Sequence, residues 1–327
     1  MLNKSLQPKV SVVIPAFNEE KFLPATLNSL LNQDSDDFEV IVVDNNSSDR
    51  TAEIARQFGA KVIFEPRQGV GFARQAGFQA AHASIIASTD ADTVVPPNWI
   101  SRIIQEFDNN PQLVIFGGPC YLYSGPLFAR LMSRWLCCAY RLLDKIMSGG
   151  WTMMGSNFAV KKETFLKING FNVNLTMGED VDFSLRAQKI GQVKFDKKFR
   201  VETSGRRFRH GLFWGLLIYI PNWFARVIFN KYKFTKLPPV RKETSLLQKY
   251  KILPLSLALT CFLIIFYNHN AFINQVRAKE INPNKINIGY ALTYLKHSGS
   301  KINKSFHQDL KKGFKKIKKI PYGKKVS

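Results

Sequence analysis

Residues 10–15 read VSVVIP, residues 38–44 read FEVIVVD, residues 61–65 read KVIFE and residues 84–90 read SIIASTD. Each is a run of β-branched and apolar residues, and stretches with helical spacing separate the four runs. Buried parallel strands read as near-continuous Val and Ile runs, because helices cover both faces of such a sheet. The N-terminal part of the chain therefore predicts an α/β fold with a mostly parallel sheet and helices on both faces.

Helix signals agree with this pattern. Ser48 or Asp49 is the expected N-cap of the stretch TAEIARQF, and Gly59 stands where a C-terminal glycine is expected. Further along, a helix is predicted from about Leu127 to Ile146. The glycines of residues 149–172 then indicate loops around a short strand and a short helix.

Charge divides the chain into two predicted domains, residues 1–205 and 206–327. The first has 22 Lys+Arg against 21 Asp+Glu, a net charge of +1, and the second has 25 against 3, a net charge of +22. The basicity thus belongs to the C-terminal region, and its partner need not be the substrate of the neutral part.

The cysteines and the N-terminus bear on the compartment. Cys120, Cys137, Cys138 and Cys261 form no C-x-x-C pair, which disfavours a disulfide framework or a zinc site and favours a reducing compartment. No apolar stretch of signal-peptide length precedes the first predicted strand. We therefore expect the N-terminal part of the chain to be cytosolic.

Polar residues follow three of the predicted strands, at the edge of an α/β sheet where ligands bind. They are Asn18 and Glu19, then Asp44, Asn45 and Asn46, then Asp90 and Asp92. Each group alone is also explained by turn formation or helix capping. Asp90 and Asp92 form a D-x-D pair whose oxygens suit Mg²⁺ or Mn²⁺, which would neutralise a diphosphate.

A second acidic cluster, Glu179, Asp180 and Asp182, opens a predicted helix after Gly178. Acidic residues in a first turn complement the helix dipole, which is the simple explanation. A carboxylate in a glycine-bearing loop can also face a cleft and serve as a general base for an alcohol acceptor.

Five segments together resemble the successive motifs of family 2 glycosyltransferases, over about residues 9–205. They are SVVIPAFNEEKFLPATLNSLLNQ, VIVVDNNSSDRTAEIA, GVGFARQAG, STDADT and GEDVDFSLRAQKIG. The resemblance implies the GT-A fold, an inverting reaction and a nucleotide-diphosphate sugar donor. It implies that the nucleotide sugar is bound by Pro15, Ala16, Phe17, Asn18, Glu19, Asp44, Arg74, Asp90 and Ala91. It further implies that Asp92 binds the divalent cation, Mg²⁺ or Mn²⁺, and that Asp180 is the catalytic base with Glu179 supporting it.

Chemical reasoning is consistent with inversion. Displacement at an anomeric carbon needs a cation on the departing diphosphate and one carboxylate to take the acceptor proton. A retaining reaction would need a second carboxylate as nucleophile, and Asp182 is disfavoured because it faces elsewhere than Asp180 on a helix.

The sequence allows two interpretations of several basic residues. Arg74 lies in a segment containing G-x-G, but the glycine pattern and its position fit a dinucleotide site poorly. It is either a phosphate partner or part of a solvated helix face. Arg206 and Arg207, in SGRRFRHG, either contact a phosphate or an anionic acceptor, or belong to a basic surface stretch. His210 is a candidate metal ligand by position only.

The basic region contains two apolar stretches, residues 212–229 and 252–267, of which the second is 16 residues long. About 20 residues are needed to span a bilayer, so surface binding is favoured over one or two short transmembrane segments. Phe306, Leu310, Phe314 and Ile317 recur at helical spacing among lysines, as in an interfacial helix. A mainly helical region at the cytoplasmic face of an anionic membrane is therefore expected.

These observations predict a metal-dependent glycosyltransferase of cell-envelope biosynthesis with a membrane-linked acceptor, a lipid carrier or a glycan. Two alternatives stay open. One is a basic nucleic-acid-binding protein with an α/β scaffold, although long apolar runs in the basic region favour lipid. The other is a glycosyltransferase with a soluble acceptor.

Overall fold

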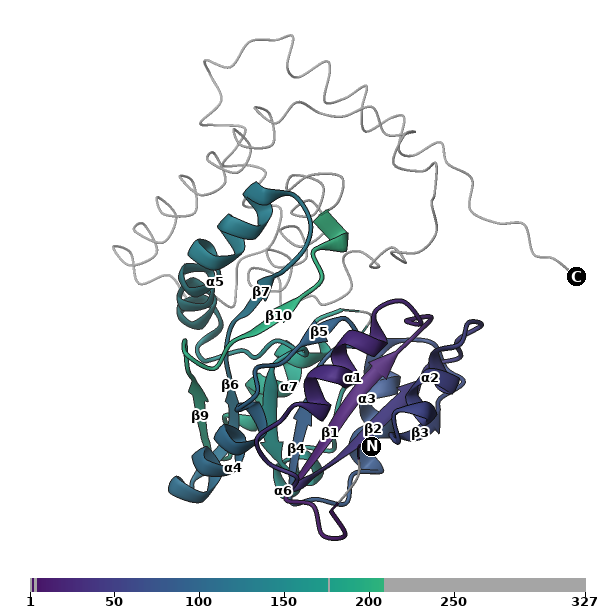
Figure 1. Ribbon diagram of the computed structural model, residues 1–327. Coiled ribbons are helices and arrows are strands. Elements are labelled where there is room, and N and C mark those ends of the chain that lie inside the picture. Colours follow the sequence, from purple (N-terminus) through teal and green to yellow (C-terminus); the bar gives the residue numbers. More distant parts are fainter. Residues whose placement is uncertain (1, 3–4, 176, 209–327) are drawn as a thin grey trace, which may run out of the picture. The chain divides into compact units, whose positions relative to one another are not determined.

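The computed structural model describes residues 2, 5–175 and 177–208 (Figure 1). The predicted boundary after residue 205 lies near the end of this range. The apolar stretches 212–229 and 252–267, His210 and the lysine-rich end lie outside the described residues, so the expectations for them stay predictions.

A seven-stranded sheet forms the centre of the described part. Its strands are β1 (Val10–Ala16), β2 (Phe38–Asp44), β3 (Lys61–Phe64), β4 (Ile85–Ser88), β6 (Leu113–Gly117), β8 (Phe158–Lys161) and β9 (Gln192–Phe195). They lie in the order β3-β2-β1-β4-β8-β6-β9. Of the neighbouring pairs, β8 is antiparallel to β4 and β6, and the others are parallel. The mostly parallel α/β sheet is confirmed.

Helices cover both faces of this sheet. One face packs against α1 (Leu23–Leu31), α2 (Thr51–Gln57) and α4 (Trp99–Asn109), with Leu27 and Ile103 fully buried in the same core cluster as alternate residues of β1 and β2. The other face packs against α3 (Val70–Gln79), α6 (Lys162–Lys167) and α7 (Glu179–Ala187), with Phe78 and Phe183 in its core. Both faces of the strands are thus dry, which explains their unbroken Val and Ile runs.

Local signals set the helix ends in most places. Asp49 accepts a hydrogen bond from the Thr51 N–H at 3.0 Å, although the residue at the N-cap position is Arg50 rather than the expected Ser48 or Asp49. Gly59 follows α2 with φ of 81°, as expected for a C-terminal glycine. Gly77 lets α3 lie close to the sheet, because a Cβ there would come within 2.3 Å of Val13.

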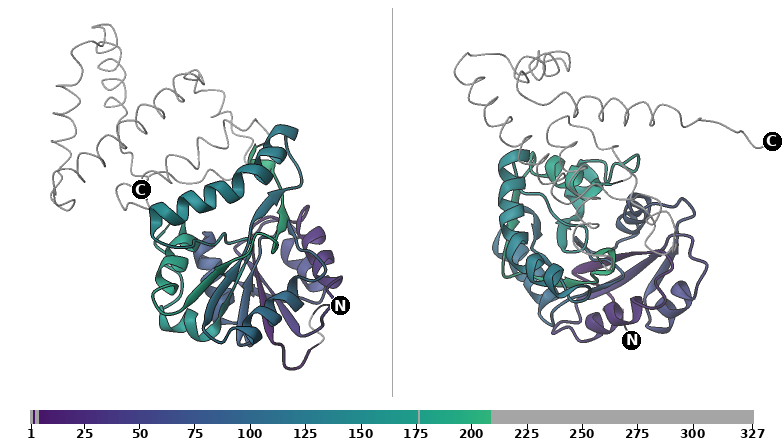
Figure 2. Two further views of the ribbon diagram at one scale, coloured as in Figure 1. Left: turned by 90° about the vertical axis from the view of Figure 1, so that its left-hand side faces the viewer. Right: turned by 90° about the horizontal axis from the view of Figure 1, so that it is seen from above.

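A smaller three-stranded sheet adjoins the candidate site. It contains β5 (Thr93–Val94), β10 (Val201–Thr203) and β7 (Cys120–Leu122), in that order, and β10 leads into a short 3₁₀ helix, Arg206–Phe208. The long helix α5 (Leu127–Ser148) follows β7 and lies outside the two helical layers (Figure 2). Among the described helices, none combines the length and apolar character that crossing a bilayer requires.

Candidate active site

The loops after β1 and β2 are tied to each other by hydrogen bonds. The Asn18 N–H donates to the Ser47 hydroxyl at 2.9 Å, and the Ser48 N–H donates to the Asn18 side-chain oxygen at 2.6 Å. Asn18 has φ of 51°, a left-handed conformation that asparagine tolerates. Asp44 accepts from the Ser47 N–H at 3.0 Å. The predicted nucleotide residues from Pro15 to Glu19 and Asp44 therefore form one structured edge of the sheet.

Arg74 is buried in an ion-pair network at the centre of the site. Its Nη2 lies 2.7 Å from Asp90 Oδ1, and its Nη1 bonds the Glu179 carboxylate. Only 4% of the Arg74 side chain is exposed, so the solvated-face interpretation is wrong. Its contact with a nucleotide sugar stays a proposal, and its terminal nitrogens already hold two candidate site residues together.

Asp180 is the second residue of α7, and backbone groups orient its carboxylate. Its Oδ2 accepts from the Gly155 N–H at 2.7 Å and its Oδ1 from the Val181 N–H at 2.8 Å. The second bond fits a role at the helix N-terminus, where the dipole favours the anion. Each oxygen keeps a second lone pair, so helix stabilisation and proton acceptance are compatible. Asp182 instead pairs with Arg186 at 2.7 Å, so it is engaged elsewhere, as expected.

Glu179 lies beside Asp180 but in a different environment. Its side chain is 5% exposed and faces Arg74. Burial, reinforced by the charge of Asp180, raises the pKa of Glu179, and Arg74 opposes the rise. Glu179 is thus placed to hold Arg74 rather than to exchange protons with solvent.

Arg206 closes the other end of the network. Its guanidinium makes two bonds to Glu19, of 2.9 and 2.7 Å, and lies 3.0 Å from Asp92 Oδ2. It also stacks over the Phe22 ring at 4.6 Å. The interpretation of Arg206 as part of a basic surface stretch is therefore wrong. Arg207 is half-buried and makes no ion pair with any described residue, so its predicted anion contact stays untested.

The D-x-D turn joins the two arginine clusters. Asp90 binds Arg74, Asp92 binds Arg206, and the Ala91 carbonyl between them accepts from the Thr26 hydroxyl of α1 at 2.9 Å. Burial raises the pKa of Asp92 to about 6, with Asp90 and Glu19 adding to the rise and Arg206 opposing it. The turn therefore carries two carboxylates in different surroundings.

Residues 11–168 match the family model described as Glycosyl transferase family 2. This segment of the chain belongs to glycosyl transferase family 2. The five motifs described above include four that fall inside the matched range, and the acidic pair of α7 lies just beyond it.

Curated glycosyltransferases match part of this chain. An uncharacterized glycosyltransferase of Mycobacterium bovis is 41% identical over 105 residues, which cover 32% of this chain and 46% of the relative. The glucosyl-dolichyl phosphate glucuronosyltransferase of Haloferax volcanii is 26% identical over 177 residues, which cover 51% of this chain and 56% of the relative. The chain thus spans about half the length of these relatives.

Among solved structures, the mannosyltransferase PcManGT from Pyrobaculum calidifontis, in complex with GDP-Man and Mn²⁺, is similar with a TM-score of 0.48 and 18% identity. The match covers 70% of this chain and 70% of that one.

The carboxylates of the candidate site fit a hard divalent cation held partly by substrate. Seven charged groups follow one another across the site, five carboxylates and two guanidinium groups: Glu19, Arg206, Asp92, Asp90, Arg74, Glu179 and Asp180. The carboxylates outnumber the cations, so a diphosphate would meet excess negative charge. Mg²⁺ binds through one or two carboxylates plus phosphates. Among the described residues, no group of three or more His, Cys, Asp or Glu is placed to hold a metal ion by itself.

The loop of residues 152–157, which no sequence motif indicated, contacts the site residues Asp180 and Arg74. Gly155 donates to Asp180, and its carbonyl accepts from the Ser88 hydroxyl at 2.6 Å. A Cβ at Gly155 would come within 2.1 Å of Arg74 Nη2, so the loop fits directly against the guanidinium. The sequence signal was only a glycine in a predicted loop.

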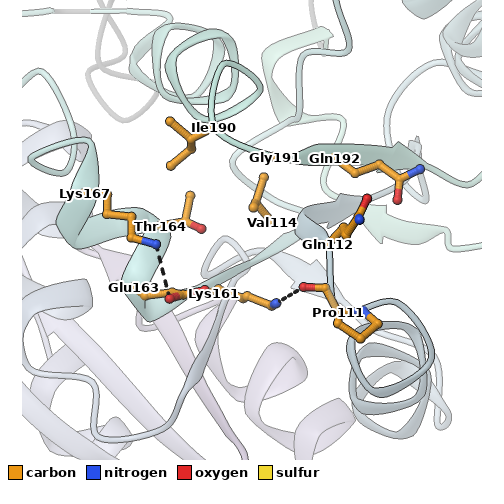
Figure 3. Close-up of a pocket in the computed structure, with 10 residues that line it drawn as sticks. All are labelled: Pro111, Gln112, Val114, Lys161, Glu163, Thr164, Lys167, Ile190, Gly191 and Gln192. Atoms are coloured by element: carbon orange, nitrogen blue, oxygen red, sulfur yellow. Dashed lines mark hydrogen bonds and ion pairs between the residues drawn. The ribbon is translucent and has the colours of Figure 1, made fainter.

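A hollow lies at the opposite end of the sheet, where β6 and β9 begin (Figure 3). Lys167 pairs there with Glu163 at 3.4 Å, and the Lys161 ammonium bonds the Pro111 carbonyl. In the sheet register Lys161 pairs with Ile85 at the start of β4, whereas the D-x-D turn follows the end of β4. This hollow is therefore separate from the candidate active site.

Proposed function

We propose that the chain is an inverting, metal-dependent glycosyltransferase that moves a sugar from a nucleotide-diphosphate donor to a membrane-linked acceptor. The observation that carries the proposal is the continuous network from Glu19 through Arg206, Asp92, Asp90 and Arg74 to the Glu179–Asp180 pair. It connects the loop proposed for the nucleotide with the carboxylate proposed as base. Membership of residues 11–168 in family 2 supports the same reaction class.

Each group has a distinct task in this proposal. Residues Pro15 to Glu19, Asp44 and the D-x-D turn bind the nucleotide and ribose. Asp92 holds the cation, which when bound stabilises the charge that develops on the departing diphosphate. Arg206 then leaves Asp92 and pairs with a phosphate, because its planar fork binds phosphate as well as it binds carboxylate.

Asp180 takes the proton of the acceptor hydroxyl. The two backbone N–H groups that donate to its carboxylate oxygens fix its orientation. Glu179 and Arg74 hold the base and the D-x-D turn at a constant separation. With a single base on the acceptor side, direct displacement inverts the anomeric carbon.

A lipid-linked acceptor is supported by two observations. The chain after residue 206 is strongly basic and has apolar stretches. In addition, one relative is named a glucosyl-dolichyl phosphate glucuronosyltransferase, so a protein with a similar catalytic segment acts on a lipid-phosphate sugar.

The decisive test compares Asp180→Asn with Asp182→Asn in the full chain. Donors are screened with membranes as acceptor, with and without chelator, and transfer is followed in a single turnover. Asp180→Asn should lower transfer by roughly 10²–10⁴-fold while donor binding survives, because an amide cannot accept the proton. Asp182→Asn is the matched control on the same helix and should keep the rate within about threefold. Equal rates in both variants would leave Asp180 as a helix-capping residue.

A further inference from the structure

The helix α5 exposes a continuous apolar stripe. Phe128, Leu131, Trp135, Leu142 and Ile146 are all exposed, with 78% of Trp135 and 69% of Ile146 accessible. They follow each other at intervals of three, four, seven and four residues, which places them on one face of a helix. A single exposed leucine is ordinary, whereas five large apolar residues on one face mark an interaction surface.

The opposite face of α5 is anchored by polar residues. Arg141 and Asp144 are buried, and both bond Thr152, the first residue of the loop that ends at Asn157. The Ser133 hydroxyl accepts from the Leu122 N–H of β7 at 3.1 Å. The helix therefore has a fixed orientation, and its apolar stripe points away from the sheet that it packs against.

Basic residues flank the stripe on one side. Arg130, Arg134 and Lys145 are exposed, while the helix's sole acid, Asp144, is buried. Arg134 has a partner, Glu202, at 3.3 Å, but both side chains remain about half exposed. An apolar stripe with Trp and Phe beside exposed cations is the pattern of a helix that lies in the headgroup region of a membrane.

We propose that α5 docks the protein on an anionic lipid surface, with Trp135 and its neighbours inserted at headgroup depth and the flanking cations on lipid phosphates. Charge selects this occupant over two others. Residues 206–327 carry a net charge of +22, so their charged stretches would be repelled by α5, and coverage by one of their apolar stretches is an outcome of the test below. A second copy would likewise bring its own Arg130, Arg134 and Lys145 to the same surface. Anionic lipid complements both the helix and the basic region.

Docking through α5 would also orient the reaction. Through Arg141, Asp144 and Thr152, the helix holds the loop whose Gly155 N–H binds Asp180. The proposed acceptor side would then lie close to the lipid surface, and this step rests on the proposed function. The docking itself does not, because it requires no donor, metal or turnover.

The test is vesicle co-sedimentation of the full chain without substrates. Trp135→Ser/Leu142→Ser and, independently, Phe128→Ser/Ile146→Ser are compared with Phe64→Ser/Leu166→Ser, whose apolar side chains are similarly exposed elsewhere. On vesicles of phosphatidylglycerol and phosphatidylcholine, each α5 variant should partition at least about tenfold more weakly, and the control pair within about twofold of wild type. Added salt, or vesicles of phosphatidylcholine alone, should also weaken wild-type binding.

Three results would overturn the proposal. The first is vesicle binding by both α5 variants equal to that of wild type. The second is a change of oligomeric state in light scattering that accompanies the α5 substitutions, which would assign the stripe to a second copy. The third is a lower thermal unfolding midpoint with unchanged vesicle binding, which would assign it to a segment of the same chain. If both α5 variants bind vesicles more weakly as expected but the wild-type chain transfers no sugar in the donor screen, the result would count against the proposed function alone.

Discussion

Gly155→Ala should disable the site by steric means alone. The added Cβ would lie 2.1 Å from Arg74 Nη2, and ordinary contact begins at 3.4 Å, so one partner must move by 3.4 − 2.1 = 1.3 Å. If the guanidinium moves, its 2.7 Å contact with Asp90 lengthens to about 4 Å and is lost. If the loop moves, the 2.7 Å bond from the Gly155 N–H to Asp180 is lost instead.

The expected cost follows from these two terms. A lost hydrogen bond to a charged group costs about 1.5–3 kcal/mol, and overpacking adds about 1–3 kcal/mol. We therefore expect Gly155→Ala to lower the free energy of unfolding by about 3–5 kcal/mol and to reduce transfer. Urea unfolding followed by tryptophan fluorescence measures the first quantity, and single-turnover transfer the second.

The matched control is Gly71→Ala. A Cβ on Gly71 would meet Val173 at 3.7 Å and Glu179 at 3.8 Å, which are ordinary contacts in the same cluster. Because Gly71 lies in α3, alanine should be neutral or stabilise by up to about 1 kcal/mol. In an Arg74→Met background, Gly155→Ala should lower the free energy of unfolding by at least about 1.5 kcal/mol less than it does in the wild-type chain, because the guanidinium that it clashes with is gone. An equal cost in both backgrounds, or a cost below about 0.5 kcal/mol, would refute the steric argument.

Three further predictions concern charged groups. Arg74→Met should cost about 3–5 kcal/mol of unfolding free energy, measured by urea titration, because it leaves buried Glu179 without its cation. Asp92→Asn should abolish Mn²⁺-dependent binding of nucleoside diphosphates in calorimetry with little change in stability, and unchanged affinity would contradict the metal assignment. Burial tends to raise the pKa of Glu39. Hydrogen bonds from Ser11 and His82 outweigh this effect, so the pKa of Glu39 is lowered. The ionised Glu39 carboxylate thus stabilises the fold at pH values above its pKa in the unfolded state. This stabilisation is lost as the pH falls through its pKa in the folded state. The deficit of Glu39→Gln, about 1–2 kcal/mol near neutral pH, should therefore shrink in acid.

The sequence by itself was enough for the local elements of the fold. The apolar runs of residues 10–15 and 38–44 predicted buried strands, because a strand covered on both faces is apolar at most of its positions. The sequence also predicted three local features: the C-terminal glycine Gly59, the helix from Leu127 and the acidic start of α7. Each depends only on residues within one or two helical turns. The membership of residues 11–168 in family 2, expected from the motifs, is also confirmed.

Only the tertiary structure decided how the site residues are paired. Arg74 meets Glu179 across 105 positions, and Arg206 meets Glu19 across 187 positions. Such pairs depend on the strand order, in which antiparallel β8 lies between β4 and β6. The loop of residues 152–157 immediately precedes β8, and its Gly155 N–H reaches Asp180. No local pattern carries that information.

The same limit applies to α5. Charged side chains are mostly exposed in proteins and tryptophan is mostly buried, yet in α5 Arg141 and Asp144 are buried and Trp135 is exposed. The sequence determined that a helix forms here. The structure decided which face is buried, because Arg141 and Asp144 carry opposite charges 3.8 Å apart and both bond the Thr152 hydroxyl, which lowers the cost of burying them.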